Sequence, residues 1–303
     1  MQENTDALQD DKAARLRDLL DLVDDSEISS IKTTVAELIR LINDPKSSAK
    51  DLKEVIQLDP PLTAKLLKLA NSAYYGFPRT IGDIQEAVVC VGFDELKELA
   101  LHQKVSQLFN QNDDFAGYSR ARLWKHCVAV AVCGKLIFTK ELNQPGGNAY
   151  VCGLIHDIGI ILEDQFLLDA FFQILDSYGA REDNFWTLEQ QKLGYDHADI
   201  GHAVAVDWNF PEEIATAIKF HHNIDHAEDE SAIMTYALFV ANAICQTKEI
   251  GFGDIAKQDN AILYESVDKL NKAAGCKINE KSLENLMQEV QETIVKMEKA
   301  GWF

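Results

Sequence analysis

The chain has 303 residues, of which 47% are hydrophobic and 26% are charged. This length and composition predict a compact soluble protein with one large or two modest domains. The formal net charge of -20 argues against direct binding to nucleic acid, because a phosphate backbone requires a basic surface. No apolar segment follows a basic start, and no apolar run approaches the length of a membrane span. We therefore expect a cytoplasmic protein without a membrane anchor.

The six cysteines lie mostly in apolar segments, and none forms a CxxC pair. Such a pattern is typical of reduced, buried thiols. Neither a zinc knuckle nor a disulfide framework is expected.

Residues 1–30 are strongly acidic but retain an apolar pattern. Leu16, Leu19, Leu20 and Val23 recur at helical spacing. This spacing predicts an amphipathic N-terminal helix that packs on the rest of the protein rather than a disordered tail.

Residues 31–112 are predicted to form an N-terminal helical lobe. Asp44 precedes a proline that ends one helix, and Ser47 or Ser48 with Asp51 has the pattern of a helix N-cap. Asp83 and Asp94 are predicted to cap the next two helices. For the loop at 71–76, helix termination is a better explanation than a recognition surface, since Asn, Ser and Gly are ordinary turn residues.

The segment 110–120 is predicted to separate this lobe from a second one, because its apolar periodicity lapses and polar residues cluster. Residues 113–250 are predicted to form the second helical lobe, which includes two amphipathic helical stretches at about 164–177 and 182–193. Residues 251–303 are predicted to form two packing helices around Gly275, the last with one apolar stripe of Leu283, Leu286, Val290, Ile294 and Met297. No segment has the pattern of a β-strand. We therefore predict an all-α fold.

The stretch VCGLIHDIG, from Val151 to Gly159, places a His-Asp pair in an apolar run. We expect one helix here, ended by the glycine, with His156 and Asp157 about 100° apart around its axis. An imidazole and a carboxylate in apolar surroundings need hydrogen bonds or a metal ion. The pair therefore requires partners from elsewhere in the chain.

Other histidines supply candidate partners. His126 lies in an apolar helical segment, where a lone histidine is more often a satisfied core residue than a ligand. His197 and His202 are about 140° apart on a helix, so that only one of them is expected to face the site. His221 and His222 lie near the end of a helix predicted to begin at Pro211, where the helix dipole alone could favour them.

Three motifs, in this order, resemble the HDOD domain, a bacterial signalling relative of the HD phosphohydrolases. They are DPPLTAKLLKLANSAYYG at 59–76, IGDIQEAVVCVGFDELKEL at 81–99 and HADIGHAVAVDWNFPEEIATAIKFHH at 197–222. The resemblance extends over residues 33–245. It implies an HD-domain-like multi-helix bundle with an N-terminal helical lobe.

The resemblance also implies a metal site, whose ligands would be His126, His156, Asp157, His197, His221, His222 and Asn242. Imidazole and carboxylate ligands suit Fe, Mn, Zn or Ni. One or two such divalent ions are expected, with Asp157 bridging them if there are two. Asp157 would be catalytic only if the protein is a hydrolase.

Two positions depart from the hydrolase pattern. Asn242 stands where HD hydrolases have their last metal-binding aspartate, and Ile160 stands where the HD-GYP cyclic-dinucleotide hydrolases have a lysine for the substrate phosphate. We therefore favour a signalling module with weak or no catalysis that binds a regulatory protein partner. The alternative is a metal-dependent phosphohydrolase whose ligand is a nucleotide or cyclic nucleotide.

Overall fold

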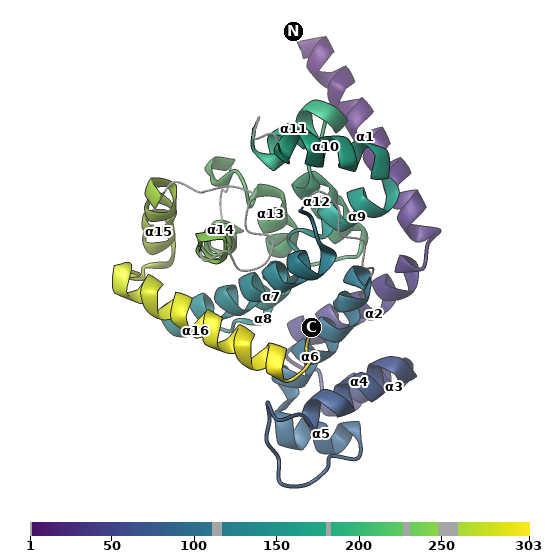
Figure 1. The fold of residues 1–303 in the computed structure, drawn as a ribbon, viewed down its shortest axis with the longest axis vertical. Helices are drawn as coiled ribbons and strands as arrows, with labels where there is room; N and C mark the ends of the chain where they lie inside the picture. Colours follow the sequence, from purple (N-terminus) through teal and green to yellow (C-terminus); the bar gives the residue numbers. More distant parts are fainter. Residues whose placement is uncertain (1, 111–116, 180–182, 227–230, 248–259) are drawn as a thin grey trace.

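The protein is all-α over the residues that the computed structural model describes, which are 2–110, 117–179, 183–226, 231–247 and 260–303. No β-strand occurs in these segments, as predicted. Figure 1 shows helices wrapped around a central pair, α7 (Arg120–Leu136) and α8 (Gly147–Ile155), with the N-terminal helix along one side.

The N-terminal half contributes six α-helices, which are α1 (Gln2–Asp24), α2 (Ile28–Asn43), α3 (Ala49–Gln57), α4 (Pro60–Ala70), α5 (Ile84–Val91) and α6 (Phe93–Val105). In α1, Leu19 and Val23 are buried in the core, and Leu16 and Leu20 pack against it. Lys12 donates from Nζ to Asp199 Oδ2 at 2.6 Å, which ties α1 to α12. The first helix therefore packs along its apolar stripe.

Helix boundaries in this region follow capping chemistry. Ser48 and Asp51 form a reciprocal capping box at the start of α3, and Asp83 accepts from the backbone N–H of Glu86 at the start of α5. The prediction for Asp94 is wrong, because α6 begins one residue earlier, at Phe93. Gly92, with φ of 101°, ends α5 and begins α6, and this positive φ is one that glycine adopts without strain.

The loop after α4 shows the helix-termination chemistry that its composition predicts. The Asn71 amide accepts from the backbone N–H of Ile81 at 2.7 Å and donates to the carbonyls of Ile81 and Leu67. Further along the loop, the ring of Tyr74 lies 5.3 Å from that of Trp302, between centroids. The loop thus connects the N-terminal lobe to the C-terminus.

The second half of the bundle consists of α7 (Arg120–Leu136), α8 (Gly147–Ile155), α9 (Ile158–Phe166), α10 (Leu168–Gly179), α11 (Phe185–Leu193), α12 (His197–Asp207), α13 (Glu212–Phe220) and α14 (Ala232–Thr247). A π-helical turn, Ile137–Glu141, follows α7, and a 3-10 turn, Ile224–His226, follows α13. Pro211 directly precedes α13 instead of being its first residue. The stretch predicted as one helix over 164–177 is divided between α9 and α10.

The stretch from Val151 to Gly159 is not one helix. α8 ends at Ile155 and α9 begins at Ile158, so that His156 and Asp157 lie in the break between them. Gly159 does not end a helix but lies inside α9. A Cβ there would lie 2.1 Å from the carbonyl oxygen of His197, so the glycine allows α12 to approach α9.

Two helices close the chain, α15 (Asn260–Ala274) and α16 (Glu280–Lys299), with Gly275 between them as predicted. Helix α16 packs on α7. The stripe predicted for it is buried, namely Leu283, Leu286, Val290, Ile294 and Met297.

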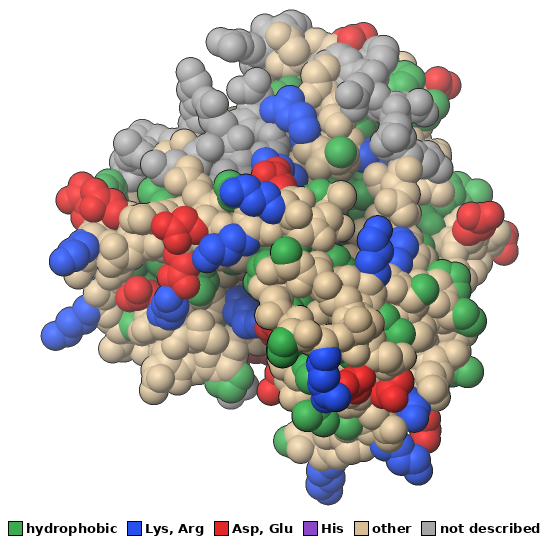
Figure 2. Space-filling view, turned by 60° about the horizontal axis from the view of Figure 1, so that its bottom comes forward, with side chains coloured by type: hydrophobic (Ala, Val, Ile, Leu, Met, Phe, Trp, Pro, Cys, Tyr) green, Lys and Arg blue, Asp and Glu red, His purple; other side chains and the backbone are tan. Residues whose placement is uncertain are grey.

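All six cysteines are free thiols. None of the described helices combines the length and apolar character needed to cross a membrane. On the face drawn in Figure 2, basic and acidic side chains of the described residues are interspersed. That face therefore lacks the continuous basic stripe that a phosphate backbone requires.

The approach of α8 to α7 gives a test of the packing. A Cβ at Gly153 would lie 2.5 Å from the backbone nitrogen of Ala131, so Gly153→Ala must push the two central helices apart. We expect it to lower the free energy of unfolding by about 1 to 3 kcal/mol in urea denaturation.

Gly179→Ala is the matched control, because nothing lies within 4 Å of a Cβ at that exposed position. It should change the free energy of unfolding by less than about 0.5 kcal/mol. Equal effects of the two substitutions would contradict this packing.

Candidate metal centre

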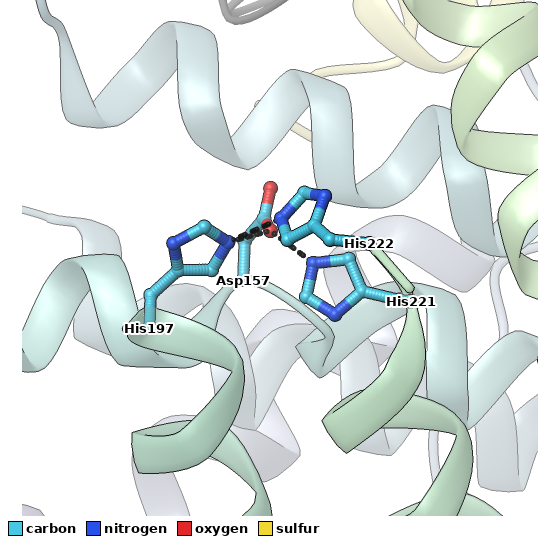
Figure 3. A group of neighbouring side chains, drawn as sticks. All are labelled: Asp157, His197, His221 and His222. Atoms are coloured by element: carbon cyan, nitrogen blue, oxygen red, sulfur yellow. Dashed lines mark hydrogen bonds and ion pairs between the residues drawn. The ribbon is translucent and has the colours of Figure 1, made fainter. Parts of the chain in front are cut away.

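The site is built around the carboxylate of Asp157, between α8 and α9. His126 reaches it from α7. Figure 3 shows His197 from the first turn of α12, and His221 and His222 from the segment after α13, around the same carboxylate. Asn242 comes from α14. All but His222 are buried, and Asp157 is 4% exposed. The predicted set therefore converges in the interior of the bundle.

The two oxygens of Asp157 face different histidines. Oδ2 lies 3.1 Å from Nε2 of His156 and 3.8 Å from Nε2 of His126. On the other side, Oδ1 lies 3.4 Å from Nε2 of His221 and 3.6 Å from Nε2 of His197. Two atoms that each bind one ion at about 2.1 Å lie about 3.0 to 3.4 Å apart. Most of these separations are close to that range.

Three of the histidines are fixed in one tautomer by the hydrogen bond on the far side of the ring. Nδ1 of His156 donates to the Gly153 carbonyl at 2.8 Å, and Nδ1 of His221 donates to the Ile218 carbonyl at 2.6 Å. Nδ1 of His197 donates to Glu189 Oε2 at 2.6 Å, and the same oxygen accepts from the backbone N–H of His197. Because these partners accept, each Nδ1 carries the proton and each Nε2 presents a lone pair.

These lone pairs fit a divalent cation. Nε2 of His156 and Nε2 of His221 are buried and make no hydrogen bond to any described part of the chain. Lone pairs that face a carboxylate repel it unless a proton or a cation lies between them. Imidazole nitrogens with one carboxylate are the ligands that Fe, Mn, Zn and Ni accept. The donor set therefore matches a transition metal better than calcium or magnesium.

The carboxylate is ionised in this setting. Burial alone would raise the pKa of Asp157, but the surrounding histidines, His156 first, hold it well below its ordinary value when they are protonated. A metal cation in their place would lower the pKa in the same direction. Asp157 is therefore a negatively charged candidate ligand at neutral pH.

His222 lies at the outer edge of the group. Its Nε2 is 2.7 Å from Nε2 of His197, and its ring stacks on Trp186 with centroids 4.3 Å apart. Burial, followed by the neighbouring His221 and His197, lowers its pKa well below the ordinary value. Because Nε2 of His197 presents a lone pair, Nε2 of His222 carries the proton of this pair. His222 could join His197 as a ligand only if this proton moved to its Nδ1, which has no hydrogen-bond partner among the described residues.

Asn242 pairs with His126. The amide Oδ1 lies 2.9 Å from Nε2 of His126, and an amide oxygen accepts, so this nitrogen carries a proton in the pair. A protonated ring nitrogen cannot bind a metal ion. On the Oδ2 side of Asp157, His156 therefore remains available as a ligand, whereas Nε2 of His126 is hydrogen-bonded to Asn242.

The comparisons with known proteins identify the family of the chain. The family model for the HDOD domain matches residues 28–224. The chain belongs to the HDOD domain family. The HDOD family, predicted from the resemblance over residues 33–245, is thereby confirmed.

Solved HDOD structures share the fold. An HDOD domain protein of unknown function from Geobacter sulfurreducens is 26% identical, with a TM-score of 0.76 over 89% of this chain and 92% of that one. A protein of Shewanella amazonensis SB2B, provisionally named a phosphohydrolase, is 27% identical, with a TM-score of 0.63 over 89% and 93% of the two chains.

One curated relative, an uncharacterised protein of Treponema pallidum, is 28% identical over 230 residues. These cover 74% of this chain but only 43% of the relative. The HDOD chain thus spans less than half of the length of that protein.

The remaining histidines lie outside the group. His102 is fully buried in α6, where its ring packs against Trp124 and Trp302. His202 is half-buried in α12, and burial with Lys219 lowers its pKa. The side chain of His226 lies outside the described residues. The prediction that His197 and not His202 faces Asp157 agrees with these positions.

Sequence reasoning missed Glu189 and Glu163. Both side chains are completely buried, and burial raises the pKa of each carboxyl well above its ordinary value. Glu189 orients His197 through the short hydrogen bond to Nδ1. In the sequence it occupies an amphipathic stretch among polar residues, and only its position eight residues before His197 distinguishes it.

The substitution Glu189→Gln tests whether Glu189 promotes metal binding by orienting the ring of His197. Glutamine keeps the size of the side chain but replaces the carboxyl group with an amide, a weaker acceptor for the hydrogen bond that holds the Nδ1 proton and the ring of His197 in place. We expect the affinity for Zn²⁺ or Mn²⁺ to fall about 10- to 100-fold, measured by competition with a chelating dye.

Glu54→Gln, on an exposed part of α3, is the control and should bind metal like the wild type. If Glu189→Gln also retained the wild-type affinity, Glu189 would have no role in the metal centre.

Proposed function

We propose that this chain is a cytoplasmic bacterial HDOD signalling module that binds one divalent transition metal tightly, has weak or no catalytic activity, and acts by binding a regulatory protein partner. The ion would lie on the Oδ1 side of Asp157, with His197, His221 and His222 as its other ligands. Three imidazoles and a carboxylate complete a four-ligand set for such an ion.

The observation that carries the proposal is the pairing of Asn242 with His126 at 2.9 Å. A dinuclear phosphohydrolase uses two ions to stabilise the attacking and the leaving oxygen. With a neutral amide in place of a carboxylate and His126 engaged by it, the Oδ2 side offers only His156 and the shared Asp157. A second ion would therefore bind there weakly.

The position after HDIG supports the same conclusion. Ile160 is completely buried within α9 and supplies no cation for a substrate phosphate. If this chain were a hydrolase, groups other than residue 160 would have to stabilise the charge of the substrate phosphate.

The role as a module is supported by the Treponema pallidum relative, in which the matching region is 43% of a longer protein. A region that is also found as part of a longer chain fits a unit that passes a signal to another domain or protein.

A metal-dependent phosphohydrolase acting on a nucleotide or cyclic nucleotide is the second candidate. It is favoured by the position of Asp157, whose two oxygens each face a separate histidine group as a bridging ligand would. The ions of such a site lower the pKa of a bound water and neutralise phosphoryl charge. Asp157 would then be required for catalysis.

Metal stoichiometry tests the proposal. Wild-type protein purified with excess Zn²⁺ or Mn²⁺ and desalted should retain about one ion per chain, because only one side of Asp157 has a full ligand set. Asn242→Asp should raise this toward about two, since a carboxylate binds a divalent ion better than an amide does. The measurement is metal content by mass spectrometry.

Asn285→Asp adds the same charge on the exposed face of α16 and should leave the metal content unchanged. Two tightly held ions in the wild type would contradict the proposal and favour the hydrolase.

Activity separates the two candidates directly. We expect wild-type protein and Asn242→Asp, both loaded with metal, to turn over a generic phosphodiester and cyclic dinucleotides slowly or not at all. Robust wild-type turnover that Asp157→Ala abolishes would overturn the signalling proposal and establish the hydrolase.

A further inference from the structure

A second polar cavity lies on the opposite face of α7 from the metal centre. Lys135 is nine residues after His126 on this helix, which places the two side chains about 180° apart around the axis. The cavity, of about 180 Å³, lies between the loop after α4, α6, α7, α8 and α16. Its lining includes Tyr74, Glu98, Lys135, Tyr150, Met297 and Trp302.

The charges in this cavity are unbalanced. Lys135 donates from Nζ to Glu98 Oε2 at 2.5 Å and to Glu95 Oε2 at 3.3 Å. Two carboxylates thus share one ammonium group. Burial raises the pKa of the Glu98 carboxyl to about 7 despite the lowering effect of Lys135. Above that pH the described lining has a net negative charge.

Aromatic rings form much of the wall. The rings of Tyr74 and Trp302 lie 5.3 Å apart, and Nζ of Lys135 is 5.9 Å from the centroid of Tyr150. The faces of such rings attract cations. The ammonium group of Lys135 lies beside both the carboxylates and a ring, so this combination of groups accommodates a cation.

One residue of the cavity wall, Trp302, has an unused hydrogen-bond donor. Trp302 is 6% exposed, and its Nε1 is buried without a hydrogen-bond partner among the described residues. A buried indole N–H without a partner is costly, and a bound molecule with an oxygen acceptor would satisfy it. This observation is independent of the charge imbalance and concerns a residue of the same cavity wall.

We propose that this cavity is a binding site for a small ammonium compound that also has a hydroxyl or other oxygen acceptor. The cation would lie beside Glu98 and the aromatic rings, the carbon atoms against the apolar wall that includes Met297, and the oxygen at Nε1 of Trp302. The volume is well below the roughly 300 to 1,000 Å³ of pockets for drug-sized ligands, so a nucleotide is too large. An anion could approach Lys135 only beside two carboxylates.

Choline and its neutral carbon isostere, dimethylbutanol, provide a matched pair of probes. They have nearly the same shape and the same hydroxyl, and differ in charge. In calorimetric titration of the full chain at about pH 8, where the Glu98 carboxyl with its pKa of about 7 is ionised, choline should bind at least tenfold more tightly. Equal binding of both, or no binding of choline at millimolar concentration, would overturn the proposal.

Two variants locate the site. Glu98→Gln should weaken choline binding about tenfold, whereas Glu54→Gln on the exposed face of α3 should not. Trp302→Phe keeps an aromatic ring but removes the N–H, so it should weaken choline binding and leave the binding of tetramethylammonium, which has no hydroxyl, unchanged. Choline binding that survives both Glu98→Gln and Trp302→Phe would place the ligand elsewhere and contradict the assignment. These variants lie away from Asp157, so the result is separate from the metal centre.

Discussion

A buried carboxylate surrounded by imidazole lone pairs is the constraint on which the second half of this structure depends. Asp157 is held between two helices, and the Nε2 atoms of His156, His197 and His221 point at it because their Nδ1 atoms are hydrogen-bonded from behind. Each of these outer partners belongs to the element that carries the histidine or to the helix before it. The helices therefore fix ring orientation and tautomer together, and a cation between the rings and the carboxylate would remove their repulsion.

Close packing of the helices positions these histidines around Asp157. Gly159 allows the backbone of His197 to lie directly against α9, and Gly153 allows α8 to lie against α7, which carries His126. A methyl group at either glycine would collide with the neighbouring backbone. The separations around Asp157 thus depend on two contacts that contain no site residue other than His197. On the other face of α7, Trp302 and Tyr74 connect the C-terminus and the N-terminal lobe. One helix thereby separates the metal centre from the aromatic cavity.

Much of this could be predicted from the sequence. Local signals gave the all-α fold, the capping box at Ser48, the loop at Asn71 and the stripe of α16, because caps and periodicity act within a few residues. The residues that converge on Asp157 could be named from the resemblance, since HDOD motifs are ordered in the chain, and their role as metal ligands stays a prediction. The break at His156 was not predicted, because its neighbours are uniformly apolar and no turn residue marks the boundary. Glu189 and Trp302 were also missed, since their roles depend on contacts with residues distant in space or sequence, which no local pattern shows.

The most direct test of the central claim is an anomalous-difference map from crystals grown with Mn²⁺ or Zn²⁺ and measured at the absorption edge of that metal. One dominant peak is predicted, about 2 Å from Asp157 Oδ1 and from the Nε2 atoms of His197 and His221. A peak of equal height between Asp157 Oδ2, His156 and His126 would show a complete dinuclear centre and contradict the role assigned to Asn242. The absence of any peak at Asp157 would contradict the metal centre itself.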